Sequence, residues 1–449
     1  MKPTTTPPVD RRTFLRAASA ASAAGMATWA SSGFAPVHAA TQSPNEKVIV
    51  AVMGVNGRGD VLAKTFAANA NAEVAYICEV DERVLAERMP AYTEIQGRAP
   101  QHVVDFRRAL DDAQVNALVI AAPDHWHAPA TLLALSAGKH VYVEKPASHG
   151  PHEGEMMVEA QREHGLVVQM GNQQRSDARS IAVVQQIREG LIGRAYYARA
   201  WYANTRESIG RGQPAAVPAG LDYELWQGPA PRTEYRDNVV HYNWHWFWTW
   251  GTGEVCNNGT HEIDVARWAL DAGLPLRVTS AGGRYHYSDD WECPDTQEVG
   301  FDFEDKTIVW QGRSCNGFQV LERGRGVSIH GTEGTVVLDR NGFQLYDADN
   351  VLVRADIGGG AADALDTRGE DGMTERHIGN FIDAVRTGAK LHSPIEVGHV
   401  STLLCHLGNI AHRVGRSLQT DPQTGHIIGD DEAMKLWTRD YAPGWEPVI

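Results

Sequence analysis

Two short segments carry side chains that suit proton transfer at an alcohol or a carbonyl. One is Glu144-Lys145-Pro146, and the other runs from Asn257 through His261 to Asp264. A histidine titrates near neutral pH and can take a proton from a hydroxyl group while the attached carbon loses a hydride. A lysine can hydrogen-bond the oxyanion that develops, and burial lowers the pKa of a lysine. We therefore interpret Lys145 and His261 as candidate catalytic residues.

Structural alternatives exist for each of these residues. His261 could cap a helix that begins there, and Lys145 could be a solvated lysine at a strand end. Asp264 lies three residues after His261 and shares a helix face with it. It could orient the histidine during catalysis, or it could only cap the helix. The amide of Asn257 can orient a hydroxyl but cannot take its proton.

A strand, a glycine-rich loop, a helix and a second strand at 47–80 are typical of dinucleotide binding. The loop contains Gly54, Asn56, Gly57, Arg58 and Gly59. Glycines permit a tight turn and close approach of a pyrophosphate, which binds at the N-terminus of the helix. Asn56 replaces the middle glycine of the fingerprint, and asparagine tolerates unusual backbone angles better than most residues.

Glu79 ends the second strand, about 20 residues after the loop, where an acid binds the adenosine ribose hydroxyls. An acid there favours NAD over NADP, because it repels a 2′-phosphate. The alternative is a solvated loop acid.

Further apolar runs at 115–122, 140–143 and 166–170 alternate with helical patterns, and we expect six strands with crossover helices. Such a doubly wound parallel sheet binds its ligands at the carboxyl ends of the strands. Residues at those ends are candidate cofactor contacts: Pro123, His125, His127, Glu144, Lys145, Asn172 and Gln173.

The pattern changes near residue 172. Alternating stretches at 194–202, 277–287, 297–303, 307–310, 317–323, 326–331 and 334–338 predict an antiparallel sheet with one packed face. The expected fold class is therefore α/β, with an N-terminal Rossmann domain at 45–171. The second domain, at 172–449, is α/β with a large, mostly antiparallel open sheet.

The glycine loop, Glu144-Lys145-Pro146 and Gly259-x-His261-x-x-Asp264 together resemble the glucose–fructose oxidoreductase / inositol dehydrogenase / MocA superfamily. The resemblance covers nearly the whole chain after its first 39 residues. It implies hydride transfer between a nicotinamide and a sugar or cyclitol carbon, and a homo-oligomer formed through the open sheet. Lys145, His261 and Asp264 match the family's functional positions. Many dehydrogenases of the family have an aspartate where this chain has Asn257, and the pattern is similar to exported members, including NAD-dependent glycosidases.

Residues 1–39 resemble a twin-arginine export signal. Arg11, Arg12 and Arg16 precede an Ala/Ser-rich run, and Val37-His38-Ala39 offers a cleavage site. The alternative is a disordered tail that contains two arginines. Export by the twin-arginine translocation machinery predicts a periplasmic protein folded around tightly bound NAD. No later run is apolar enough to span a membrane, so no membrane association is expected after export.

Composition excludes several classes of partner and bound group. The net charge of −15 argues against nucleic acid. Five cysteines without a CxxC pair do not describe a disulfide framework. We also expect no metal site, because the histidines show no recognised ligand spacing. Four tryptophans spaced by two, from Trp244 to Trp250, would share one face of an extended chain and could contact a sugar, a subunit interface or the core.

Little free NAD is available outside the cytoplasm, so an exported enzyme must restore its cofactor within each cycle. An oxidoreductase acting on a sugar, cyclitol or glycoside does so by reducing a second carbonyl substrate. A glycosidase does so by transient ring oxidation, elimination, water addition and re-reduction. Two other hypotheses are a binding module that has lost its chemistry and a dehydrogenase with exchangeable NAD.

Overall fold

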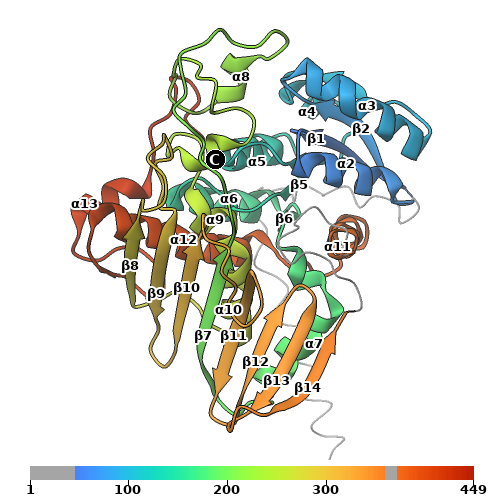
Figure 1. Cartoon of the computed structure of the whole chain (residues 1–449). Coiled ribbons are helices and arrows are strands. Elements are labelled where there is room, and N and C mark those ends of the chain that lie inside the picture. Colours follow the sequence, from blue (N-terminus) through green and yellow to red (C-terminus); the bar gives the residue numbers. More distant parts are fainter. Residues whose placement is uncertain (1–45, 359–371) are drawn as a thin grey trace, which may run out of the picture. The chain divides into compact units, whose positions relative to one another are not determined.

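The computed structural model describes residues 46–358 and 372–449 (Figure 1). The expected export signal at 1–39 lies outside the described residues. Two sheets, one of six strands and one of nine, organise the described chain. The first is parallel and the second mostly antiparallel, which confirms the expected α/β fold class.

The six-stranded sheet has the order β3-β2-β1-β4-β5-β6. Its strands are β1 Val48–Met53, β2 Ala72–Cys78, β3 Gln101–Val103, β4 Ala117–Ile120, β5 His140–Val143 and β6 Val168–Met170. The strand order reverses between β1 and β4, and in such sheets ligands bind beyond the carboxyl ends at this point. Strand β3 lay outside the ranges located from the sequence, because Gln-His-Val contains no apolar run.

Both faces of this sheet are buried. Val48, Val50 and Val52 of β1 pack into one apolar cluster, and Ala51 and Met53 pack into the other. This accounts for the continuous apolar sequence of β1. The covering helices are α2 Arg58–Ala68, α3 Glu82–Gln96, α4 Arg107–Leu110, α5 His127–Ser136, α6 Pro151–His164 and, from late in the chain, α11 Met373–Thr387.

The nine-stranded sheet has the order β14-β13-β12-β11-β7-β10-β9-β8-β15. Strands β7 and β10 pair in parallel, and the other neighbours are antiparallel. The bounds are β7 Ala195–Ala203, β8 Arg277–Gly283, β9 Thr296–Asp302, β10 Thr307–Arg313, β11 Arg325–Gly331, β12 Gly334–Asp339, β13 Gly342–Asp347, β14 Leu352–Ile357 and β15 Leu418–Gln419.

The strand predicted at residues 317–323 is not present in the structure. Residues 317–319 are a loop, and residues 320–323 form a tight turn closed by hydrogen bonds between Val320 and Arg323. Leu321 and Glu322 both have positive φ, 51° and 60°, which a strand does not allow. Strands β13 and β14 lie beyond the last strand that the sequence predicted.

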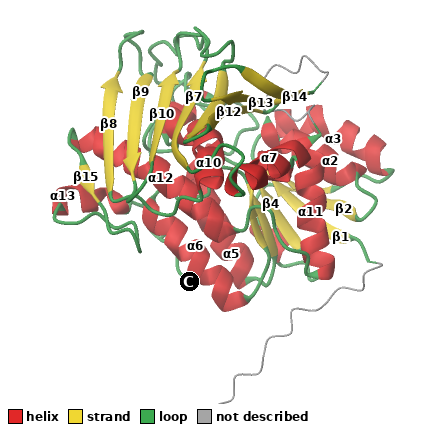
Figure 2. Ribbon diagram, turned by 90° about the horizontal axis from the view of Figure 1, so that it is seen from below, coloured by secondary structure: helices red, strands yellow, loops and turns green. Residues whose placement is uncertain are grey.

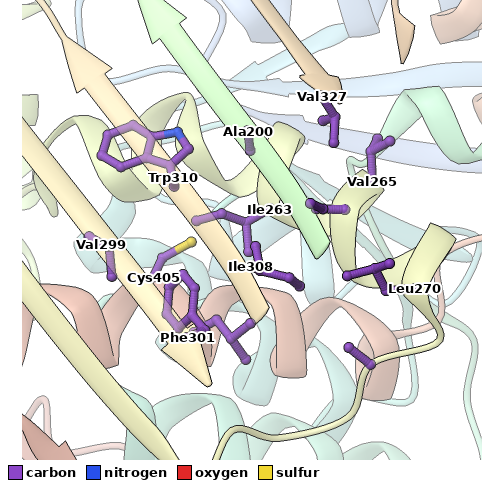
Figure 3. Packing of buried hydrophobic residues seen from close by; sticks show 14 of the residues in the cluster. Ala200, Ile263, Val265, Leu270, Val299, Phe301, Ile308, Trp310, Val327 and Cys405 are labelled. Carbon is purple, nitrogen blue, oxygen red and sulfur yellow. The ribbon is translucent and has the colours of Figure 1, made fainter. Parts of the chain in front are cut away.

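Helices α10 Gly259–Leu270 and α12 Ile395–Val414 pack on one face of this sheet (Figure 2). Figure 3 shows Ile263 of α10 and Cys405 of α12 near Phe301, Ile308 and Trp310 of the strands. Buried and half-buried side chains alternate along β10, as expected for a sheet with one packed face. The remaining α-helices are α7 Ala178–Arg188, α8 Tyr223–Gln227, α9 Gly253–Asn257 and α13 Asp431–Met434.

Residues 204–252, which we name the crossing segment, lead from β7 to α9 and return to the parallel sheet. The Asp222 N–H donates to Val80 O (2.9 Å), and the Glu82 N–H donates to Gly220 O (2.9 Å). His241 Nε2 lies 2.8 Å from Asp81 Oδ2. The crossing segment thus lies against the chain just beyond β2. Within residues 46–358 and 372–449, no helix is long and apolar enough to cross a membrane.

Candidate functional site

A cavity of about 670 Å³ lies beyond the carboxyl ends of β1, β2, β4 and β5 and extends to the nine-stranded sheet. Most of the residues expected from the sequence line it: Gly54, Asn56, Gly57, Arg58, Glu79, Pro123, His127, Glu144, Lys145, Gln173, Asn257 and His261. The cavity therefore brings the glycine loop and both candidate catalytic residues together.

Three expected cofactor contacts do not line the cavity. Gly59 lies in α2, where an added Cβ would stand 1.7 Å from Gly54 O, so this glycine permits the loop to close on the helix. His125 is buried, with Nε2 3.0 Å from Trp226 O, and burial lowers its pKa to about 3. The Asn172 side chain is also buried, and its amide atoms have no hydrogen-bond partner among the described residues.

Asp264, the third candidate catalytic residue of this segment, does not line the cavity. Its carboxylate accepts hydrogen bonds from Arg175 Nε and Nη2 (2.7 and 2.9 Å) and from Ser401 Oγ (2.6 Å). The Arg175 guanidinium also lies over the Trp268 ring, 5.1 Å from its centroid. The ion pair with Arg175 and the hydrogen bond with Ser401 therefore join α10 to the 3₁₀ helix Gln173–Ser176 and to α12.

The glycine loop has the shape that a pyrophosphate requires. Gly54 has φ +80°, and an added Cβ would approach Ala121 O at 3.0 Å. At Gly57 an added Cβ would meet nothing within 4 Å, so open space adjoins the loop before the N-terminus of α2. The positive φ falls on Gly54 and not on Asn56, so no glycine is needed at position 56.

Glu79 organises the end of the cavity near the glycine loop. Its Oε2 accepts from Val55 N–H (2.8 Å), and its Oε1 accepts from Val80 and Asp81 N–H (2.8 and 3.0 Å). Burial raises the pKa of Glu79, although these hydrogen bonds oppose the shift. A carboxylate oxygen has two lone-pair sites, so Oε2 keeps one for a ribose hydroxyl. The loop and Glu79 together fit the adenosine and pyrophosphate of a dinucleotide.

Glu144 joins the loop to the candidate catalytic lysine. It accepts from Arg58 Nε (2.9 Å), from Gln173 Nε2 (3.0 Å) and from Lys145 N–H (3.3 Å). Burial alone would raise its pKa, but the Arg58 and Lys145 charges outweigh burial and lower it. An added Cβ at Gly171 would meet this carboxylate at 2.8 Å, so a glycine there makes room for it.

Lys145 Nζ donates to Asn257 O (2.7 Å) and to Asn257 Oδ1 (3.1 Å). Burial lowers the pKa of Lys145, although the charges of Glu144 and Asp124 oppose the shift. This lysine thus spans the space between the parallel sheet and α9. Its ammonium is held by neutral oxygens, which stabilise the charge less than a carboxylate would.

His261 lies near the start of α10 and is 4% exposed. Its Nε2 has no hydrogen-bond partner among the described residues. Burial, followed by the charges of Arg340, Arg325 and Lys145, lowers its pKa well below 6.5. The ring is therefore neutral at physiological pH. A buried polar atom without a partner beside a cavity is suited to a ligand.

Several cavity residues were missed in the sequence because no motif marks them. They include Asp124, Tyr202, Arg206, His241, Tyr242 and His245. Arg206 Nη1 donates to the Tyr242 hydroxyl (2.6 Å), and the guanidinium lies over the Trp246 ring. Burial lowers the pKa of His245 to about 3.

The four tryptophans do not share a face, because Asn243–Trp246 forms a 3₁₀ helix. Trp244 lines the cavity and stacks on His245, with ring centroids 3.6 Å apart. Trp246 stacks on Trp291 in the core (3.9 Å), and Trp248 and Trp250 lie outside the cavity lining.

Comparison with known proteins identifies the class. Residues 48–172 match the model "Oxidoreductase family, NAD-binding Rossmann fold", and residues 199–317 and 369–446 match "Oxidoreductase family, C-terminal alpha/beta domain". Together the two models cover most of the chain. The chain belongs to this Gfo/Idh/MocA oxidoreductase family, as the sequence motifs predicted.

The chain is 35% identical over 254 residues to 1,5-anhydro-D-fructose reductase of Ensifer adhaerens, covering 56% of this chain and 65% of the reductase. It is 27% identical over 219 residues to a glycosyl hydrolase family 109 protein of Saccharopolyspora erythraea, covering 45% of this chain and 48% of the relative. The chain thus spans about half to two thirds of the length of such curated relatives.

The fold is shared with levoglucosan dehydrogenase in complex with NADH and levoglucosan. The TM-score is 0.64 at 20% identity, covering 83% of this chain and 99% of that structure.

Proposed function

We propose that this protein is a nicotinamide-dependent oxidoreductase that exchanges a hydride with a sugar, cyclitol or glycoside in the described cavity. One observation carries the proposal: Lys145 and His261 Nε2, which has no hydrogen-bond partner in the described part of the chain, adjoin the same cavity as a glycine loop shaped for a dinucleotide. A binding module without chemistry would have no need of a buried, neutral imidazole beside a lysine of lowered pKa.

The roles follow from the chemistry of each group. Glu79 and the glycine loop would hold the dinucleotide, whose nicotinamide would supply the hydride acceptor or donor. The neutral His261 takes the hydroxyl proton during oxidation and returns it during reduction. Lys145 hydrogen-bonds the substrate oxygen and stabilises the charge that develops on it.

The proposed substrate class rests on the cavity wall. Tyr202, Asn204, Arg206 and Tyr242 present hydroxyl, amide and guanidinium groups, and Trp244 adds an aromatic face. Sugars combine hydroxyl groups with apolar C–H faces, which suits such a wall. The sugar-acting relatives named above support this choice.

We also propose that NAD is tightly bound and that the protein is exported to the periplasm by the twin-arginine route. The crossing segment supports retention, since it lies beyond β2 and contributes His241 to the cavity. The signal-like residues 1–39 support export.

Purified protein tests this proposal directly. Close to one NAD per subunit should be released on denaturation, identified by mass and absorbance. Without added NAD, a suitable sugar should reduce the bound nicotinamide once, and a carbonyl acceptor should then restart turnover. Recovery of mostly apo protein that binds NAD weakly would contradict retention. Turnover that depends strictly on added NAD would contradict the closed cycle.

NAD-dependent glycoside hydrolysis is the second candidate. Asn257 replaces the aspartate of many family dehydrogenases, and family 109 glycosyl hydrolases are among the relatives. An aryl glycoside alone would then turn over many times without accumulating reduced nicotinamide. Solvent deuterium would enter the carbon next to the oxidised one, because elimination removes that proton. Absence of deuterium would favour net oxidoreduction.

A further inference from the structure

Glu254 is a buried carboxylate in the first turn of α9, 3% exposed and outside the cavity lining. Its Oε2 accepts from Arg206 Nε (2.7 Å) and Ser314 Oγ (3.1 Å). Its Oε1 accepts from Asn257 Nδ2 (3.2 Å), Arg206 Nη2 (3.3 Å) and Asn258 Nδ2. A carboxylate offers about four lone-pair sites, so this one is saturated by the protein. It is therefore unavailable to a substrate and acts through its neighbours.

The Asn257 side chain lies between two groups of opposite hydrogen-bonding character. Its Oδ1 accepts from Lys145 Nζ, which only donates, and its Nδ2 donates to Glu254, which only accepts. A neutral amide satisfies both partners in one orientation. Residues 254, 257 and 258 share one helix face by their spacing, so α9 directs both amides toward the same carboxylate.

We infer that Glu254 is a positioning residue: it fixes the Asn257 amide so that Oδ1 holds Lys145 in the cavity. This inference rests on the proposed function of Lys145. An aspartate at 257 would place a second carboxylate about 3.2 Å from Glu254, where two like charges repel. The presence of Glu254 thus accounts for the asparagine.

The variant N257D tests this arrangement. Burial and the neighbouring Glu254 charge should raise the pKa of the introduced carboxyl, against the opposing Lys145 charge 3.1 Å away, so that at the acid end of the pH profile it is protonated and still donates to Glu254. Reduction of bound nicotinamide by N257D should then be fastest at low pH. It should fall by up to about tenfold per pH unit above the raised pKa. The charged groups that face this position are Glu254, Lys145, Arg206, Asp124 and Arg325.

The double variant N257D/E254Q moves the charge from position 254 to position 257. The rate of nicotinamide reduction should then no longer fall at high pH, because the introduced carboxyl faces an amide and Lys145. E153Q/N257D is the matched control: Glu153 is equally buried and pairs with Arg439 away from the cavity. That control should lower thermal stability without restoring the pH profile.

Thermal unfolding supplies a readout that needs no substrate. A carboxyl whose pKa is higher in the folded than in the unfolded state lowers the stability of the folded state as pH rises. The loss occurs between the pKa of the unfolded state and the pKa of the folded state. The Tm deficit of N257D relative to wild type should therefore grow from pH 5 to pH 8, and E254Q should remove this growth. An N257D protein with the wild-type Tm and pH profile throughout would overturn the inference. If no carbohydrate tested reduced the bound nicotinamide of the wild type, the proposed function alone would fail, because the Tm measurement needs no substrate.

Discussion

His261 and Lys145 are linked by charge as well as by position. The Lys145 ammonium is one cause of the lowered pKa of His261, so a proton on one group disfavours a proton on the other. The pair can therefore hold one proton beside the substrate oxygen at neutral pH. This arrangement suits a reaction that moves a single proton with each hydride.

Substitution of either residue should separate chemistry from binding. H261A should lower kcat by roughly 10² to 10⁴, the range of a general acid or base, while NAD remains bound. K145M should lower the rate of nicotinamide reduction and raise the pKa of His261, so that the acid limb of the pH profile moves upward. Stopped-flow absorbance of the reduced nicotinamide measures both effects.

D264N is the matched control for these variants, because Asp264 lies on the same helix but pairs with Arg175 outside the cavity. It should reduce Tm and leave kcat within a few-fold of wild type. Near-wild-type kcat in H261A would assign His261 a structural role.

Sequence patterns located those groups whose function depends on local chain geometry. The glycine loop, Lys145 and His261 each follow or begin a regular element, so a short motif predicts their position. No sequence pattern indicated Glu254 or Arg206, because these two residues interact with each other across 48 positions of the chain. Helical spacing relates Asp264 to His261, whereas its ion-pair partner Arg175 is 89 residues away and no local pattern indicates that contact.

The crossing segment forms one wall of the cavity. Its cluster of Leu221, Tyr223, Trp226, Trp244 and Trp250 packs on itself, while His241 and Asp222 attach it to the end of β2. The spacing of the four tryptophans by two would place them on one face only if this part of the chain were extended. The 3₁₀ turn instead directs successive aromatics to the cavity and to the core, which a period-two pattern cannot anticipate.

Loosening the crossing segment should accelerate cofactor loss. H241A removes the 2.8 Å contact with Asp81 while leaving the glycine loop intact. If this contact contributes about 1.4 kcal/mol to the free energy that holds the crossing segment against β2, its loss would raise the rate of NAD dissociation about tenfold. The measurement is NAD retained per subunit after dilution and repeated gel filtration. D237A serves as control, since Asp237 bonds Gln213 N–H within the segment (2.9 Å). Equal retention in H241A and D237A would show that this contact does not hold the cofactor.

At the scale of the whole molecule, the core encloses histidines in both halves of the chain. Burial lowers the pKa of His125 to about 3, of His377 to about 4 and of His406 to about 3, and it lowers that of His261 well below 6.5. All four are buried. Unfolding exposes them to water, where their pKa returns to about 6.5. Below that pH the unfolded chain therefore binds protons that the folded chain excludes.

Stability should consequently fall as pH drops from about 6.5 toward 4. Each such histidine contributes a slope of about 1.4 kcal/mol per pH unit, so four would give uptake of about four protons on unfolding near pH 5. Glu79, Asp124 and Glu262, whose pKa values burial raises, act in the opposite sense. H406Q isolates one histidine, because glutamine can still donate to Ser148 O, which His406 Nε2 faces at 3.1 Å, and the carboxylates are unchanged. The free energy of unfolding of wild type and of H406Q should be measured by denaturant between pH 5 and pH 7. The slopes of the two curves against pH should differ by the equivalent of about one proton bound on unfolding. Parallel curves would mean that His406 binds its proton in the folded state.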